Sequence, residues 1–138
     1  MIAVIVLVVV IVATIAVGTA LRSRSGRFRA VDSPDGGNLD PDLAAIGVGV
    51  HQPIVLHFSA SWCGPCAAVR RVIGQVLERA PGTAREIELD LDENPVLARK
   101  LGVLSLPTTF VFDASGSERF RVSGVPSADD LRAVLAAL

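Results

Sequence analysis

A run of 21 residues without a charged side chain opens the chain and limits how the rest can fold. Residues 1–21 consist mostly of Val, Ile, Leu and Ala. A helix needs about 20 consecutive apolar residues to cross the hydrocarbon core of a bilayer. We therefore expect residues 1–21 to form a single transmembrane helix that anchors the protein in the lipid bilayer.

Two other interpretations of this run stay open. A cleaved signal peptide has a basic amino-terminal region, a short apolar core and small residues at its cleavage site. Residues 18–20, Gly-Thr-Ala, resemble such a cleavage site, but no Lys or Arg precedes the apolar run. The run is also about twice the usual length of a signal-peptide core. A buried core helix is the third interpretation, and a retained anchor fits the sequence best.

The charges that flank the run predict its orientation. Arg22, Arg24, Arg27 and Arg29 follow it, whereas only the α-amine precedes it. Because Lys and Arg are enriched on the cytoplasmic side of membrane helices, we expect the domain to lie in the cytoplasm. A domain on the outer face of the membrane is the alternative. Beyond Arg29 the chain carries more acidic than basic residues, which argues against nucleic acid as a partner because phosphate binding requires a basic surface.

The sequence divides into three parts. Residues 22–39 are rich in Arg, Ser, Gly and Asp, so we expect a flexible linker after the anchor. Within the linker, residues 28–31 can form a short edge strand. Residues 40–138 show regular apolar patterns and are expected to form one domain.

The patterns in the domain predict an alternation of helices and strands. A short helix opens at Pro41, and a second helix runs from Cys63 to about Ala80. Strands are expected at residues 53–59, 85–91, 108–112 and 118–123, and further helices at 95–102 and from Ser127 to the end. This order predicts an α/β fold with a mixed central sheet flanked by helices on both faces.

The only two cysteines of the chain are Cys63 and Cys66, separated by Gly64 and Pro65. They follow a predicted buried strand and open a predicted helix. The amino end of a helix stabilises a thiolate through its free N–H groups and dipole. We expect the more exposed Cys63 to attack a disulfide and Cys66 to resolve the mixed disulfide, while Gly64 and Pro65 shape the turn.

Two other roles are possible for a cysteine pair of this spacing. A structural zinc site needs four ligands, but the chain has no second pair of cysteines and only His51 and His57 to add. An inert structural disulfide is the other possibility. Neither explains the placement of the pair between strand and helix, so no metal is expected.

These motifs resemble the thioredoxin family over residues 40–138. Residues 62–66, Trp-Cys-Gly-Pro-Cys, reproduce the active-site signature of that family. Leu106, Pro107 and Thr108 are similar to its cis-proline loop, and residues 92–95 are similar to its strand-to-helix turn. Gly124 falls where the family has a glycine in the substrate groove.

The resemblance implies a thioredoxin-like fold and a protein-disulfide reductase that transfers electrons and maintains cell redox homeostasis. Trp62 would shield the reactive sulfur, and Leu106, cis-Pro107 and Gly124 would contact the substrate. The implied partners are disulfide-containing proteins and an upstream thiol reductase; the redox-active cysteine pair replaces any cofactor, and we expect a monomer. The alternatives are an extracytoplasmic thiol reductase for cytochrome or envelope protein maturation, and a non-catalytic docking module.

One departure from the family concerns proton transfer. The family usually has a buried Asp six residues before the nucleophile and a Lys on the neighbouring strand, where this chain has His57 and Glu88. We hypothesise that Glu88 holds the tautomer of His57, and that His57 takes the proton from Cys66 through water, since histidine exchanges protons near neutral pH. A buried histidine without a catalytic role is the alternative.

Overall fold

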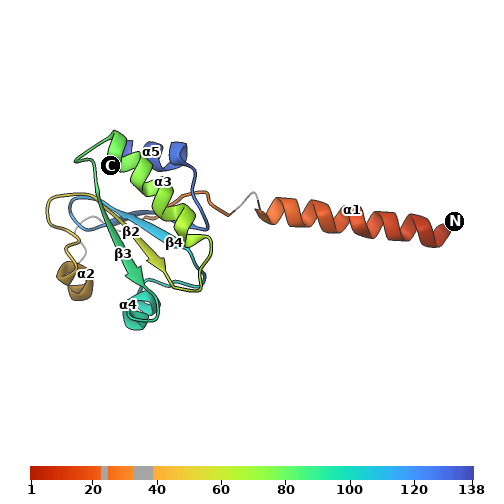
Figure 1. The fold of residues 1–138 in the computed structure, drawn as a ribbon, viewed down its shortest axis with the longest axis horizontal. Helices are drawn as coiled ribbons and strands as arrows, with labels where there is room; N and C mark the ends of the chain where they lie inside the picture. The colour runs from red at the N-terminus through yellow and green to blue at the C-terminus, as the bar shows by residue number, and fades with distance from the viewer. Residues whose placement is uncertain (23–24, 33–38) are drawn as a thin grey trace.

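The computed structural model describes residues 1–22, 25–32 and 39–138. Helix α1 (Ile2–Arg22) extends away from the remainder of the chain (Figure 1). It is long and apolar enough to cross a membrane, and none of its apolar stretch is buried against the domain. The helix expected in residues 1–21 is therefore present.

Five strands form one mixed sheet in the order β1-β5-β4-β2-β3. The strands are β1 (Arg29–Ala30), β2 (Ile54–Ser59), β3 (Arg85–Asp90), β4 (Thr108–Phe112) and β5 (Glu118–Ser123). Strands β2 and β3 are parallel, and every other neighbouring pair is antiparallel. Strand β2 is an interior strand, between β4 and β3, and its carboxyl end leads into the cysteine motif.

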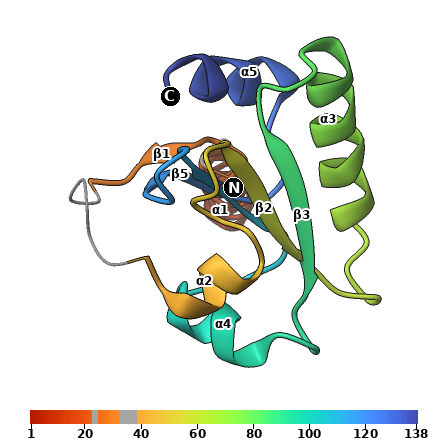
Figure 2. The same ribbon diagram turned by 90° about the vertical axis from the view of Figure 1, so that its left-hand side faces the viewer.

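Helices cover both faces of this sheet, which confirms the predicted fold class. Helices α3 (Cys66–Arg79) and α5 (Ala128–Ala136) lie over one face, and α2 (Pro41–Ala45) and α4 (Pro95–Lys100) lie over the other (Figure 2). Successive residues of a strand point to opposite faces. Each face consequently has its own apolar core.

The two cores differ in composition. The face under α2 and α4 buries three phenylalanines, of which Phe58 and Phe110 pack edge to face at 6.1 Å and Phe110 and Phe112 stack at 6.3 Å. The face under α3 and α5 is built from aliphatic side chains: Val55, Val69, Ile73, Val76, Val111, Leu131 and Leu135. The aliphatic core ends at the cysteine motif.

Helix α3 begins at Cys66, three residues later than the sequence predicts. The residue before a proline is disfavoured in the helical region, so Gly64 ahead of Pro65 delays the helix. Cys63 lies in the preceding turn, where its N–H donates to the Ala60 carbonyl at 3.0 Å and its carbonyl accepts from the Cys66 N–H at 3.3 Å.

Part of the expected flexible linker belongs to the sheet. The Gly26 N–H donates to the Ser123 carbonyl at 2.8 Å, and the Val31 N–H donates to the Arg119 carbonyl at 2.9 Å. Phe28, between them, packs half-buried against the aliphatic core. Residues 25–31 are thus docked on β5 by backbone hydrogen bonds and one aromatic side chain, and the predicted edge strand is present as β1. Residues 23–24 and 33–38 of the expected linker lie outside the described residues.

Candidate functional site

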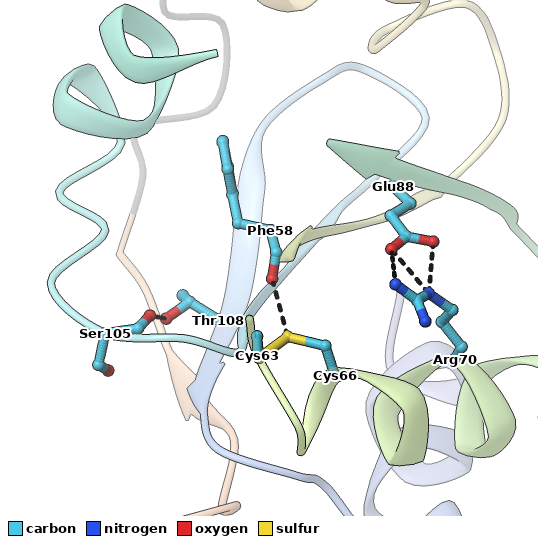
Figure 3. Close-up of a disulfide and its surroundings, with 7 residues drawn as sticks. All are labelled: Phe58, Cys63, Cys66, Arg70, Glu88, Ser105 and Thr108. Carbon is cyan, nitrogen blue, oxygen red and sulfur yellow. Dashed lines mark hydrogen bonds and ion pairs between the residues drawn. A yellow bond between two sulfur atoms is a disulfide. The ribbon is translucent and has the colours of Figure 1, made fainter. Parts of the chain in front are cut away.

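Cys63 and Cys66 form a disulfide between the carboxyl end of β2 and the first turn of α3, with their Cα atoms 5.6 Å apart (Figure 3). Cys63 is half-buried, whereas Cys66 is fully buried. The Cys66 sulfur lies 4.0 Å from the Phe58 carbonyl oxygen, over the last residues of β2. A substrate disulfide can therefore approach Cys63 from solvent but not Cys66.

The start of α3 favours the ionised form of the reduced pair. The first N–H groups of a helix have no partner within the helix, and its amino end carries a partial positive charge. Cys66 is the first residue of α3, and Cys63 lies in the turn directly before it. Both properties lower the cost of forming a thiolate there.

Trp62 forms an exposed rim beside the disulfide, with 66% of its surface accessible. Its indole N–H donates to an Asp92 side-chain oxygen at 3.2 Å. This bond fixes the indole relative to the turn after β3. Asp92 belongs to a turn motif in the sequence, but nothing in the sequence pairs residues 62 and 92, so this contact is not predictable from the sequence.

The loop before β4 completes this end of the sheet. The Leu106–Pro107 peptide bond is cis, the conformation that the family resemblance implies. The Pro107 carbonyl accepts a hydrogen bond from the Gly124 N–H at 2.8 Å, and Thr108 pairs with Phe58 on β2. The backbone pairing therefore brings Leu106, Pro107 and Gly124 to the same end of the sheet as the disulfide.

His57 is fully buried, and its partner differs from the one that the sequence predicts. The His57 Nε2 atom lies 2.8 Å from Glu86 Oε1, at hydrogen-bond distance. Glu88 instead accepts from the Arg70 guanidinium at 2.7 and 2.9 Å (Figure 3). The predicted hydrogen bond between His57 and Glu88 is wrong.

The reason lies in the geometry of β3. Glu86 and Glu88 alternate with Ile87 and point to the same face as His57, so both are within reach of β2. Arg70, on α3, engages Glu88 and leaves Glu86 to the imidazole. Burial raises the pKa of Glu88, but hydrogen bonds from Ser59 and Arg70 and the nearby His57 and Arg70 outweigh it and hold that pKa below its ordinary value.

Two buried polar side-chain atoms on strands β2 and β4 have no hydrogen-bond partner among the described residues. They are His57 Nδ1 and Thr109 Oγ1. The two residues are directly paired across β2 and β4, so their side chains share the face covered by α3. Buried polar groups are nearly always satisfied by protein or bound water, so these two atoms are an exception at the end of an aliphatic core.

The residues described include no group of three or more His, Cys, Asp or Glu side chains arranged to hold a metal ion. The chemistry that the site offers is that of the cysteine pair itself. A reduced cysteine pair reduces a substrate disulfide by thiol–disulfide exchange and is itself oxidised to the disulfide seen here.

Comparison with known proteins identifies the family. The thioredoxin family model matches residues 43–137. Thioredoxin 1 of Nostoc sp. is 32% identical over 74 residues, which cover 54% of this chain and 69% of that protein. The thioredoxin of Streptomyces clavuligerus is 33% identical over 81 residues, which cover 59% of this chain and 75% of that protein.

Solved structures agree with the sequence comparison. Chloroplastic thioredoxin z superposes with a TM-score of 0.63 at 26% identity, over 72% of this chain and 89% of that one. A malaria parasite thioredoxin-2, described as a component of protein secretion machinery, superposes with a TM-score of 0.59 at 30% identity, over 63% of this chain and 84% of that one. The family and the cysteine pair together support thiol–disulfide oxidoreductase activity. The chain belongs to the thioredoxin family.

Proposed function

We propose that this protein is a membrane-anchored protein-disulfide reductase that contributes to cell redox homeostasis. The observation that carries the proposal is the asymmetry of the pair, with Cys63 accessible and Cys66 fully buried at the start of α3. The exposed Trp62 precedes the accessible Cys63, and the cis-Pro107 loop lies at the same end of the sheet. We propose that both bind the substrate polypeptide, together with Leu106 and Gly124.

The reaction begins from the reduced pair. The Cys63 thiolate attacks one sulfur of the substrate disulfide, and the other substrate sulfur leaves as a thiolate that takes up a proton. Cys66 then attacks Cys63, which releases the second substrate thiol and leaves the Cys63–Cys66 disulfide. Two electrons have passed to the substrate, and an upstream dithiol reductase returns the pair to its reduced form. No cofactor enters these steps.

His57 is proposed to accept the proton of Cys66 during the second step. It is buried on the face of the sheet that α3 covers, and Cys66 lies over the carbonyl of the next residue, Phe58. The Nδ1 atom and Thr109 Oγ1 have no partner among the described residues, and a water bound to them would connect the imidazole to the sulfur. Glu86, at the opposite ring nitrogen, would position the imidazole.

The anchor is the second part of the proposal. Helix α1 supplies the span, and Arg22, Arg24, Arg27 and Arg29 directly after it favour a cytoplasmic domain. We propose that residues 1–21 cross the bilayer and that residues 40–138 act as the catalytic domain in a monomer. A reporter that is active only outside the cytoplasm, fused to the carboxyl terminus, tests this orientation. Activity of the reporter would favour the extracytoplasmic alternative.

Insulin reduction by the full chain in detergent micelles, with dithiothreitol as electron donor, tests the activity. We expect the wild-type protein to accelerate precipitation of the insulin B chain and Cys63→Ser to give the rate of dithiothreitol alone. Gly74→Ala serves as the control variant, because a Cβ atom at Gly74 meets no atom within 4 Å. Equal rates for wild type and Cys63→Ser would instead favour a docking module without catalysis.

A further inference from the structure

The segment between the anchor and the domain is bound to the domain at a defined place. Gly26 has a φ of +85°, and a Cβ atom there would lie 2.4 Å from the Val125 carbonyl oxygen. Residue 26 must therefore be glycine for the segment to lie as it does. With the flanking backbone hydrogen bonds and the packing of Phe28, this contact fixes residues 25–31 along β5.

The direction of this segment decides which end of the domain is anchored. Strand β1 runs antiparallel to β5, with Arg29 opposite Arg121 and Ala30 opposite Phe120. Residues 25 and 26 consequently lie beside Ser123 and Gly124, where β5 ends. A Cβ atom at Gly124 would lie 3.4 Å from the Ser25 Cβ atom. A parallel β1 would have placed the anchor at the opposite end of the sheet.

That end of the sheet is the end that carries the disulfide. Gly26 bonds to Ser123 on β5, Ser123 pairs with Thr108 on β4, and Thr108 pairs with Phe58 on β2. Three strand spacings of about 4.8 Å place Gly26 about 14 Å from Phe58. The Cys66 sulfur is a further 4.0 Å from the Phe58 carbonyl oxygen.

The chain between Gly26 and the end of α1 is short. Arg22 ends α1, and four peptide units of 3.8 Å allow at most about 15 Å between the Cα atoms of residues 22 and 26. The disulfide is thus at most about 35 Å from the end of the span. A free linker of 18 residues would by itself reach about 60 Å.

We propose that the docked linker holds the active-site end of the domain close to the bilayer, so that the preferred substrate is an integral membrane protein whose disulfide lies near the same membrane surface. This inference rests on the proposed reductase activity and on the proposed anchor. Trp62 and Leu104, which are 66% and 97% exposed, give the active-site end an apolar rim for such a partner. The exchange proceeds as described above, with the partner's disulfide reduced and the Cys63–Cys66 disulfide formed.

Mixed-disulfide trapping in proteoliposomes tests this proposal. Full-length Cys66→Ser protein is reconstituted with single-span reporters that carry one disulfide about 10 Å or about 50 Å above the bilayer on a rigid helical spacer, which rises 1.5 Å per residue. We expect the low reporter to be trapped at least about 10-fold faster than the tall one, since the tall one exceeds the reach set by the chain geometry. Equal rates, or faster trapping of the tall reporter, would overturn the proposal.

Two further variants of the trapping protein test the linker itself. Gly26→Ala collides with the Val125 carbonyl and should undock the segment, whereas Gly74→Ala is the matched control. Insertion of 20 Gly/Ser residues between positions 24 and 25 adds a random-coil reach of about 25 Å without altering the docked segment. We expect both changes to reduce the ratio of the trapping rates of the low and tall reporters to less than about 3. Gly74→Ala should leave this ratio unchanged. A preference that survives both changes would overturn the role of the linker.

Two parallel measurements separate this proposal from those on which it rests. Insulin reduction by the wild-type chain reports the reductase activity, and its loss would overturn the proposed function whatever the reporters show. Resistance to extraction at alkaline pH reports the anchor, and release of the protein would overturn the span. With both intact, reporter height alone decides the inference.

Discussion

The two faces of the interior strand β2 carry different kinds of residue. Phe58 points to the face under α2 and α4, where three buried phenylalanines pack together. His57, its neighbour, points to the face under α3, where it lies beside Thr109 at the end of an aliphatic core. The face under α2 and α4 carries apolar side chains that pack together. The face under α3 carries polar atoms at the end of the strand that leads to the buried Cys66 sulfur. The difference suggests that stability and chemistry can be altered separately.

The largest expected effect comes from a substitution on the face of the sheet under α2 and α4. Phe110→Ala removes a fully buried ring that contacts both Phe58 and Phe112. We expect the free energy of unfolding to fall by about 3–5 kcal/mol, measured by urea denaturation of the oxidised protein. Phe120→Ala, at a half-buried ring on β5, should cost less. A rate of insulin reduction per folded molecule that fell together with stability would break the separation of the two faces.

The second effect concerns the face of β2 that lies under α3 and carries His57. His57→Gln keeps a polar side chain but removes the proton acceptor, and we expect insulin reduction at pH 7 to slow by about 10- to 100-fold. The pH–rate profile should also lose one ionisation. An unchanged profile in His57→Gln would remove His57 from the mechanism.

A third and smaller effect concerns both stability and activity at one residue, His57. His57→Leu eliminates a buried nitrogen atom that has no partner among the described residues. It also removes the hydrogen bond between Nε2 and Glu86, so we expect the free energy of unfolding to change by less than about 1 kcal/mol, while reduction of insulin slows. Thermal denaturation and the insulin assay on the same sample check both halves. A variant that is destabilised by more than this would show that the imidazole contributes to packing.

The smallest effect concerns the ion pair between Arg70 and Glu88, at the margin of the face under α3. The Arg70–Glu88 ion pair is partly exposed, so a double-mutant cycle with Arg70→Gln and Glu88→Gln should give a coupling below about 1 kcal/mol. Because the folded-state pKa of Glu88 is lowered, its contribution is present above the unfolded-state pKa and is lost as the pH falls through the folded-state value. Glu88→Gln should therefore flatten the loss of stability below about pH 4.5, and an unchanged acid limb would contradict this assignment.

Much of the fold follows from local patterns in the sequence. Strands β4 and β5 occupy the residues that alternation and the intervening turn predict. Helix α5 begins after Ser127, whose hydroxyl accepts from the Asp130 N–H at 3.0 Å, as the capping pattern indicates. These elements depend on neighbours a few residues apart. Their positions can therefore be predicted without knowledge of the tertiary structure.

The contacts that were missed depend on residues far apart in sequence. Alternation along β3 indicates that Glu86 and Glu88 share a face, but only the position of Arg70 on α3 decides which of them meets His57. The docking of residues 25–31 likewise depends on β5, about 90 residues later in the chain. A two-residue strand carries too little pattern to reveal its partner. The site residues were thus easier to find than the partners that orient them.

Mass spectrometry of a trapped intermediate tests the central claim, that Cys63 attacks and Cys66 resolves, most directly. Full-length reduced Cys66→Ser protein is mixed with a peptide containing one disulfide, and the intact mass is recorded after acid quenching. We predict a covalent adduct at Cys63 in this variant and no stable adduct in the wild-type protein, which resolves it. An adduct of Cys63→Ser at Cys66 that forms as fast as the adduct at Cys63 would contradict the claim.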